Sequence, residues 1–198
     1  MCGIAGVVCP TEAAAQSAIE AMLCVQAHRG PDDAGKQFER FGDQYLGLGH
    51  RRLSILDLSP LGHQPMVHPE SHDVIVFNGE IYNFRALRKQ LLQDGEDFRS
   101  TGDTEVLLRG LTRYGPAFLQ RLEGMYAFAF LNRRDQTLLL ARDPMGIKPL
   151  YIGKSKDALV FASEVRGVLS SGLIANTLDK NGIATMLAFG AVQHPHTI

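Results

Sequence analysis

The strongest constraint on the fold is a pair of predicted β-hairpins in the second half of the chain. Residues 125–143 and 149–163 alternate apolar and polar side chains, and a polar turn interrupts each run, at 132–135 and 154–157. Such alternation is typical of antiparallel strands that cover a core on one face. Further strands are predicted at 3–8, 45–57 and 73–83.

The predicted helices fall into two groups, which suggests how they cover the strands. Residues 11–27 have apolar side chains at helical spacing, with Thr11 as the expected N-cap. A middle pair of helices is predicted at 83–95 and 102–115. The strands are too many for one sheet with one covered face. We therefore predict an α+β fold, a four-layer α-β-β-α sandwich of two mainly antiparallel sheets flanked by helices.

Composition and charge exclude several classes of partner. The 198-residue chain has a formal net charge of −1 and no dense cluster of Lys and Arg, so we expect no nucleic-acid partner. No apolar run approaches the roughly 20 residues needed to span a bilayer, and no secretory signal is recognised, so no membrane partner is expected. Three cysteines without disulfide-framework spacing are typical of a reducing compartment, which predicts a cytoplasmic protein.

Three histidines lie close together in the sequence without forming a recognisable metal motif. His63, His68 and His72 fall in a stretch that contains proline and glycine. We interpret them as solvated loop residues, because no matching pair of ligands stands out elsewhere in the chain. We therefore expect no metal site.

Cys2 follows Met1 directly and is the first candidate nucleophile. A cysteine thiol is only a few per cent ionised at neutral pH and needs a base. Removal of Met1 would create a free α-amine on Cys2 that could accept the thiol proton, because α-amines titrate near neutral pH. The alternative is structural: a small apolar side chain that starts a strand, much as Cys24 is expected to pack in the core from its helix.

Asn78 and Gly79 form the second candidate feature. An Asn-Gly pair between extended segments is the commonest hairpin-turn signal, and the turn is the more frequent interpretation. The same pair can supply a side-chain NH₂ and an unobstructed backbone N–H, which are the two donors that a tetrahedral oxyanion needs. Taken singly, Arg52 is typical of a solvated surface and Asp103 of a helix cap.

Six short blocks carry a family resemblance. They are MCGI, HRGPDD, RRLSILD, FNGEIYN, TGDTEV and RDPMGIKPLY, in this order along the chain. The chain resembles class II glutamine amidotransferases, which are N-terminal nucleophile hydrolases, over residues 2–170. The RLSILD and NGEIYN blocks are most similar to the glutaminase domain of glutamine-hydrolysing asparagine synthetase. The resemblance implies the N-terminal nucleophile hydrolase fold.

The resemblance also implies a reaction and a set of roles. Cys2, freed of Met1, would attack the side-chain amide of L-glutamine and form a thioester, which water resolves to glutamate. The α-amine of Cys2 would act as the base and then protonate the departing ammonia. The implied catalytic residues are Cys2, Asn78 and Gly79, and the implied substrate-binding residues are Arg52 for the α-carboxylate, Asp103 and Glu80 for the α-ammonium, and Leu53, Ile55 and Leu56 along the pocket wall.

Four further charged residues in these blocks are expected to serve as scaffolding or as contacts to a following domain. They are Asp32, Arg142, Asp143 and Lys148. The resemblance divides the chain into a glutaminase domain at 1–177 and, at 178–198, a linker with the truncated start of a C-terminal ATP-dependent synthetase domain. ATP and Mg²⁺ are expected only in that synthetase domain.

The resemblance implies that the released ammonia serves asparagine synthesis from aspartate in the full-length enzyme. L-glutamine and the C-terminal synthetase domain of the same polypeptide are the expected partners, and a homodimer is left open. Two alternatives remain for the function. The acceptor could be an envelope sugar or a peptide, or the chain could be a non-catalytic glutamine-sensing module.

Overall fold

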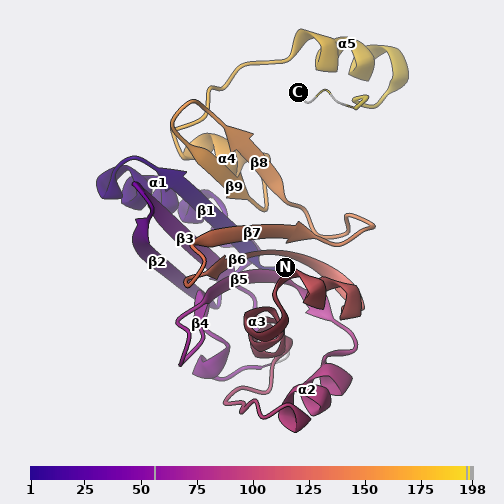
Figure 1. Ribbon diagram of the computed structural model, residues 1–198. Coiled ribbons are helices and arrows are strands. Elements are labelled where there is room, and N and C mark those ends of the chain that lie inside the picture. Colours follow the sequence, from indigo (N-terminus) through magenta and orange to yellow (C-terminus); the bar gives the residue numbers. More distant parts are fainter. Residues whose placement is uncertain (56, 195, 197–198) are drawn as a thin grey trace.

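The computed structural model describes residues 1–55, 57–194 and 196, and its centre is formed by two antiparallel sheets (Figure 1). The first sheet has the strand order β2-β3-β1-β9-β8, and the second has the order β4-β5-β6-β7. The strands of the first sheet are β1 (Gly3–Cys9), β2 (Asp33–Phe41), β3 (Gln44–Arg52), β8 (Tyr151–Lys154) and β9 (Leu159–Ala162). Those of the second are β4 (Met66–Val67), β5 (Val74–Ile81), β6 (Gly124–Asn132) and β7 (Thr137–Arg142).

Helices cover the outer face of each sheet, so the molecule has four layers (Figure 1). One apolar cluster joins α1 and α4 to the first sheet, and another joins α2 and α3 to the second. A third cluster, which includes Ile4, Val76 and Phe161, lies between the sheets. The helical elements are α1 (Glu12–Val25), α2 (Phe84–Gln93), α3 (Asp103–Tyr114), α4 (Val165–Ser170), α5 (Lys180–Phe189) and the 3₁₀ turns η1 (Ala27–Arg29), η2 (Pro60–Gly62) and η3 (Gly115–Arg121). The predicted four-layer α-β-β-α fold is confirmed.

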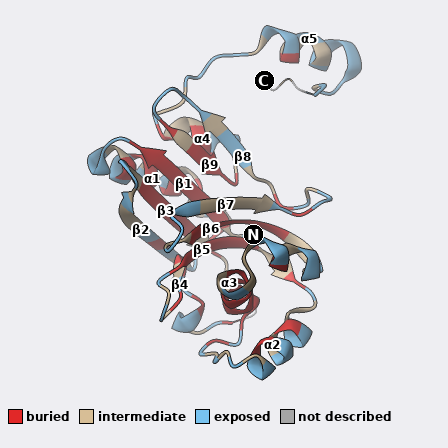
Figure 2. Ribbon diagram, viewed as in Figure 1, coloured by how far each residue is buried: buried red, intermediate tan, exposed pale blue. Residues whose placement is uncertain are grey.

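Both faces of strand β1 are apolar because each face packs against another layer of the molecule. Ile4 and Val8 pack between the sheets, whereas Ala5 and Val7 pack against α1. Side chains alternate along a strand, so a strand with helices on one side and a second sheet on the other is buried throughout. Gly6 faces the second sheet, and a Cβ there would lie 1.9 Å from the ring of Phe161. Figure 2 shows the resulting continuous burial of the central strands.

The same alternation brings three of the candidate residues to one end of the inter-sheet space. Cys2 lies two residues before Ile4, and Asn78 on β5 lies two residues after Val76. Both Ile4 and Val76 pack between the sheets. Arg52 ends β3, where Gly3 of β1 pairs with Arg51. Because residues two apart lie on the same face of a strand, these three side chains emerge on facing surfaces of the two sheets.

Several predicted boundaries differ from the structure. The predicted strand at 45–57 ends at Arg52, and β2 was not predicted at all. Gly102, and not Asp103, is the N-cap of α3. Cys24 is exposed on α1 and does not pack in the core. Thr11 does cap α1 as predicted, because its side chain accepts a hydrogen bond from the backbone N–H of Ala14 at 3.3 Å.

The segment after α4 leaves the sandwich, and Figure 1 shows α5 lying apart from both sheets. Its exposed apolar side chains include Leu187 (83% exposed) and Phe189 (71% exposed). In the part of the chain that the structure describes, no helix is both long and apolar enough to cross a membrane.

Candidate active site

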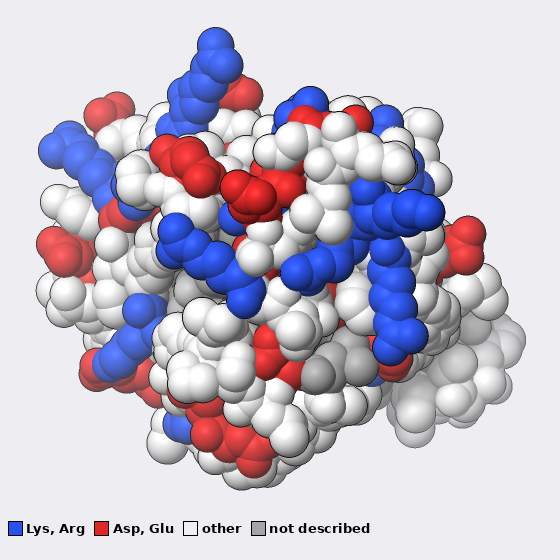
Figure 3. All heavy atoms as spheres, turned by 90° about the horizontal axis from the view of Figure 1, so that it is seen from below, with Lys and Arg blue, Asp and Glu red and all other residues white. Residues whose placement is uncertain are grey.

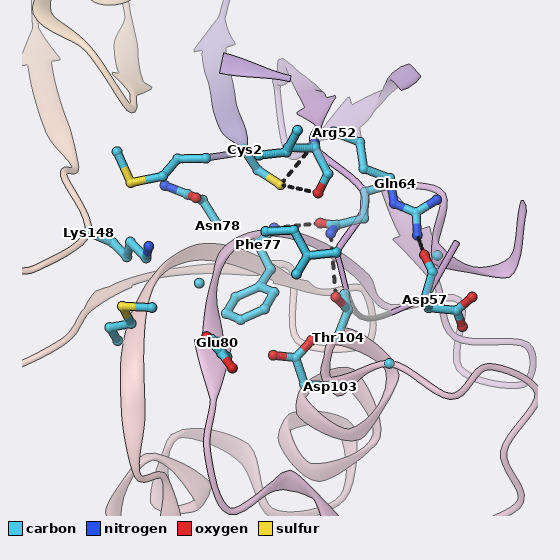
Figure 4. Close-up of a pocket in the computed structure, with 17 residues that line it drawn as sticks. Cys2, Arg52, Asp57, Gln64, Phe77, Asn78, Glu80, Asp103, Thr104 and Lys148 are labelled. Atoms are coloured by element: carbon cyan, nitrogen blue, oxygen red, sulfur yellow. Dashed lines mark hydrogen bonds between the residues drawn. The ribbon is translucent and has the colours of Figure 1, made fainter. Parts of the chain in front are cut away.

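A pocket opens at the end of the inter-sheet space and contains most of the residues singled out from the sequence (Figure 4). Its cavity volume of about 110 Å³ exceeds the space that one water needs several-fold, yet it is smaller than a drug-sized site. Such a pocket suits a small metabolite. The residues that line it include Cys2, Arg52, Leu53, Ile55, Asn78, Gly79, Glu80 and Asp103.

The thiol of Cys2 lies against the segment that follows β3. Its Sγ is 3.4 Å from the backbone N of Leu53, which donates to it, and 3.6 Å from the carbonyl oxygen of Leu53. Met1 also lines the pocket and is 56% exposed. While Met1 is attached, the nitrogen of Cys2 is an amide and cannot act as a base.

The backbone of Cys2 is held by the side chain of Arg29, which is not among the sequence-predicted site residues. Arg29 donates from Nε to the carbonyl oxygen of Cys2 at 2.9 Å and from Nη1 to Glu164 at 3.1 Å. Ser163, beside Glu164, accepts the N–H of Ile4 at 2.9 Å. Burial acts to raise the pKa of Glu164, but hydrogen bonds from Arg166, His28 and Arg29 lower it to about 2. Arg29 belongs to the HRGPDD block, which is the signal that could have identified it.

Asn78 and Gly79 lie inside β5 and not in a hairpin turn, so the turn interpretation is wrong. The Nδ2 of Asn78 is buried and has no hydrogen-bond partner among the described residues. A Cβ at Gly79 would lie 2.4 Å from the carbonyl oxygen of Met125 on β6, which leaves no room for a side chain. The strand therefore presents a free amide donor beside a position that only glycine fits.

Arg52 is 8% exposed, and its guanidinium is held by backbone carbonyls. Nη1 donates to the carbonyl oxygen of Ser59 at 3.1 Å, and Nη2 donates to that of Asp57. A Cβ at Gly62 would overlap this guanidinium. No carboxylate of the described residues lies within 4.0 Å of it, so its charge has no anionic partner in that part of the protein.

Asp103 begins α3 and places a carboxylate on the opposite wall of the pocket. Its Oδ2 accepts the backbone N–H of Ile81 at 2.9 Å, and the residue is 5% exposed. Burial raises the pKa of Asp103 to about 6, and the nearby charge of Glu80 acts in the same direction. A bound cation would relieve both effects.

The remaining predicted pocket residues have different outcomes. Leu53 and Ile55 line the cavity, and Ile55 is 71% exposed. Leu56 lies outside the described residues. Glu80 lines the pocket beside Asp103, as Figure 4 shows.

Three of the four residues expected as scaffolding form hydrogen bonds with the backbone of nearby loops and strands. Asp143 accepts the backbone N–H groups of Tyr126, Ile147 and Lys148 at 3.2, 2.8 and 3.0 Å. Arg142 donates to the carbonyl oxygen of Lys148 at 2.7 Å, and Asp32 accepts the N–H of Ser54 at 2.7 Å. Lys148 differs, because its side chain lines the pocket (Figure 4).

The histidines are not all solvated. His63 is half-exposed and pairs with Asp33 at 2.7 Å, but His68 is 5% exposed and accepts the N–H of Ser71 at 3.2 Å. Within the described residues no group of three or more His, Cys, Asp or Glu side chains is arranged to hold a metal ion. Basic and acidic side chains are interspersed on the face shown in Figure 3.

Comparisons with known proteins identify the relatives of this chain. The family model described as glutamine amidotransferase domain matches residues 1–198. The glutamine-hydrolysing asparagine synthetase 1 of Bacillus subtilis is 38% identical over 203 residues, which cover all of this chain and 31% of that protein. The amidase chry2 of Gibberella zeae is 37% identical over 155 residues, which cover 78% of this chain and 23% of that protein. The chain thus spans about a third or less of these relatives.

A solved structure supports the fold independently. Glutamine phosphoribosylpyrophosphate amidotransferase of B. subtilis, complexed with ADP and GMP, superposes with a TM-score of 0.67 at 24% sequence identity. The match covers 86% of this chain and 43% of that one. At this identity the likeness shows that the two chains share the fold.

Proposed function

Since the chain belongs to the class II glutamine amidotransferase domain family and is related to asparagine synthetases, we propose that it hydrolyses the side-chain amide of L-glutamine to glutamate and ammonia. The observation that carries the proposal is the buried Nδ2 of Asn78, which has no hydrogen-bond partner in the described part of the chain and lies in the pocket that also holds the thiol of Cys2. An unpaired buried donor costs about 1–3 kcal/mol, and a ligand oxygen bound there would remove that cost.

The proposed mechanism begins with the loss of Met1. The new α-amine of Cys2 takes the thiol proton, and the sulfur attacks the amide carbon to form a tetrahedral oxyanion. Asn78 donates from Nδ2 and Gly79 from its backbone N–H to this oxygen, and each such donor is typically worth about 2.7–4 kcal/mol. Collapse breaks the carbon–nitrogen bond, and the protonated α-amine gives its proton to the departing ammonia. Water then cleaves the thioester to release glutamate.

Substrate binding follows from the charges of the pocket walls. The guanidinium of Arg52 binds the α-carboxylate, because its planar fork matches a carboxylate and its charge has no anionic partner among the described residues. Asp103 and Glu80 bind the α-ammonium, which restores an opposite charge beside the buried Asp103. Leu53 and Ile55 line the space between them.

We further propose that the ammonia passes to an acceptor activated by a synthetase domain of the same polypeptide, with residues 178–198 as a linker and the start of that domain. The acceptor is aspartate in the leading proposal, supported by the names of the relatives, whereas the likeness to an amidase keeps another acceptor as the alternative. We assign ATP and Mg²⁺ to the synthetase domain. Residues 170–172, Ser-Ser-Gly, are not a phosphate-binding loop for ATP. Such a loop leads into the N-terminus of a helix, whereas these residues lie at the C-terminal end of α4.

Two variants test the glutaminase proposal. Cys2→Ala is expected to abolish glutamate release while the thermal unfolding midpoint stays close to that of the wild type. Cys24→Ala, which changes an exposed thiol, is the matched control and is expected to keep full activity. Full activity of Cys2→Ala would refute the proposal, and glutamine binding without turnover in a preparation shown by mass to lack Met1 would favour a sensing module.

A diazo-ketone analogue of glutamine provides a second test. It is expected to alkylate Cys2 selectively, because this thiol lies in a pocket with the Nδ2 of Asn78, unpartnered among the described residues, to bind the ketone oxygen, whereas Cys24 is exposed on α1. Equal labelling of Cys24 would contradict the assignment. Peptide mass mapping after alkylation measures the ratio directly.

A further inference from the structure

Asp57 is a buried carboxylate of the candidate site that has no role in the mechanism above. It is 8% exposed and lies in the segment between β3 and η2. Its Oδ1 accepts from the N–H and the hydroxyl of Ser59 at 2.9 and 2.6 Å. Its Oδ2 accepts from the N–H and the hydroxyl of Thr101 at 2.9 and 3.2 Å. These hydrogen bonds, that of the Ser59 hydroxyl foremost, lower the pKa of Asp57 to about 2.

The two sides of this carboxylate connect to two oppositely charged walls of the pocket. On one side, the carbonyl oxygens of Asp57 and Ser59 hold the guanidinium of Arg52. On the other side, Thr101 and the N-cap Gly102 lead directly into Asp103. Figure 4 shows Asp57 on the Arg52 side of the pocket, away from Lys148. Asp57 thus links the segment that holds the guanidinium of Arg52 to the segment that leads into the carboxylate of Asp103.

A free α-amino acid carries an anion and a cation on one carbon atom, so a site that binds both must hold its own cation and anion at a matching separation. We propose that Asp57 is the positioning residue that sets the separation of Arg52 and Asp103, and that it thereby makes the pocket selective for substrates with both an α-carboxylate and an α-ammonium group. The proposal rests on the proposed glutaminase function.

Asparagine is not a conservative replacement at this position. Each carboxylate oxygen of Asp57 faces a backbone N–H, of Ser59 on one side and of Thr101 on the other. In Asp57→Asn the amide NH₂ must face one of these backbone N–H groups in either orientation, so that backbone hydrogen bond is lost and two donors meet, whereas a hydroxyl can turn to accept. One of the two segments is then released, and the separation of Arg52 and Asp103 is no longer fixed.

The experiment measures hydrolysis of three amides by the full-length protein: L-glutamine, 4-aminobutanamide, which lacks the α-carboxylate, and glutaramate, which lacks the α-amine. Asp57→Asn is expected to raise the KM for L-glutamine at least tenfold and to change kcat less than threefold. The preference for L-glutamine over each analogue, as a ratio of kcat/KM values, is expected to fall at least tenfold. Asp135→Asn, at an exposed turn position, is the control and is expected to match the wild type.

Two outcomes would overturn the inference while leaving the glutaminase proposal intact. These are an equal loss of activity on all three amides, or a reduced kcat with an unchanged KM, in Asp57→Asn. If that variant does not fold, Thr101→Val removes only the hydroxyl bond and keeps the N–H, and it must show the same change in preference at a smaller size. Absence of glutamine turnover in wild-type protein freed of Met1 would instead refute the proposed function, and the inference with it.

Discussion

Replacing Asp103 with asparagine is expected to make the protein more stable while weakening its substrate binding. The side chain is 5% exposed, and burial raises its pKa from the ordinary 3.8 to about 6. Each pKa unit corresponds to about 1.4 kcal/mol, so the ionised carboxylate destabilises the folded state by about 3 kcal/mol at neutral pH. Asparagine keeps an oxygen that can accept the N–H of Ile81 and carries no charge.

The sign of the pH dependence follows from proton binding. Above pH 6 Asp103 is ionised in the folded and the unfolded chain, and the full destabilisation is present. Between pH 6 and pH 3.8 the folded chain keeps a proton that the unfolded chain has lost, so stability rises as the pH falls. Below pH 3.8 both forms are neutral and the destabilisation is gone. The advantage of Asp103→Asn is therefore largest above pH 6 and vanishes near pH 3.5.

Urea unfolding followed by circular dichroism, at intervals from pH 3.5 to pH 8, measures this difference. The wild type and Asp103→Asn are compared, with Asp135→Asn as a control that changes an exposed aspartate. A difference of up to about 3 kcal/mol is expected at pH 7.5, together with a higher KM for L-glutamine in Asp103→Asn. A difference that does not vary with pH, or a less stable variant at pH 7.5, would refute the reasoning.

Three further substitutions test other parts of the site. Gly79→Ala places a Cβ 2.4 Å from the carbonyl oxygen of Met125, so it is expected to lower the free energy of unfolding by about 1–3 kcal/mol, measured in urea. Asn78→Ala is expected to lower kcat about 10²–10³-fold with little change in KM or in the thermal midpoint, and an unchanged kcat would contradict its role. Glu164→Gln removes the charge that pairs with Arg29 and should cost about 1 kcal/mol or less. Because the pKa of Glu164 is lowered to about 2, that cost is present above pH 4.5 and is lost as the pH falls toward 2, which acid titration of both proteins would show.

Much of the fold could be predicted because burial on both faces of a strand or on one face of a helix leaves a regular pattern. The hairpins β6-β7 and β8-β9 follow from period-two alternation and polar turns. The strand β2 was missed because its residues are mostly polar and partly exposed at the edge of the sheet. The predicted cap of α3 is wrong because aspartate is a residue type that commonly caps helices. In the structure the carboxylate of Asp103 instead accepts the N–H of Ile81 on strand β5.

The sequence predicted which residues form the site, but it did not predict the hydrogen bonds that hold them in place. The motif blocks name Cys2, Arg52 and Asn78, and the structure brings them to one pocket. The blocks do not reveal that Arg29 holds the backbone of Cys2, because that contact spans 27 positions and links η1 to the residue that precedes β1. They also do not reveal that Asp57 bonds to Thr101, 44 positions away.

The sequence by itself determined the features that depend on residues close together in the chain, which are the alternating pattern of the strands and the cap at Thr11. It also supplied the reactive groups: a thiol, a guanidinium and an Asn-Gly pair. Only the tertiary structure decided that Asn-Gly belongs to a strand interior, that Cys24 is exposed, and that His68 is buried. Burial and hydrogen bonding depend on segments distant in the chain. The pKa values of the two aspartates shift in opposite directions because their surroundings differ: burial raises the pKa of Asp103, whereas hydrogen bonds, that of the Ser59 hydroxyl foremost, lower the pKa of Asp57.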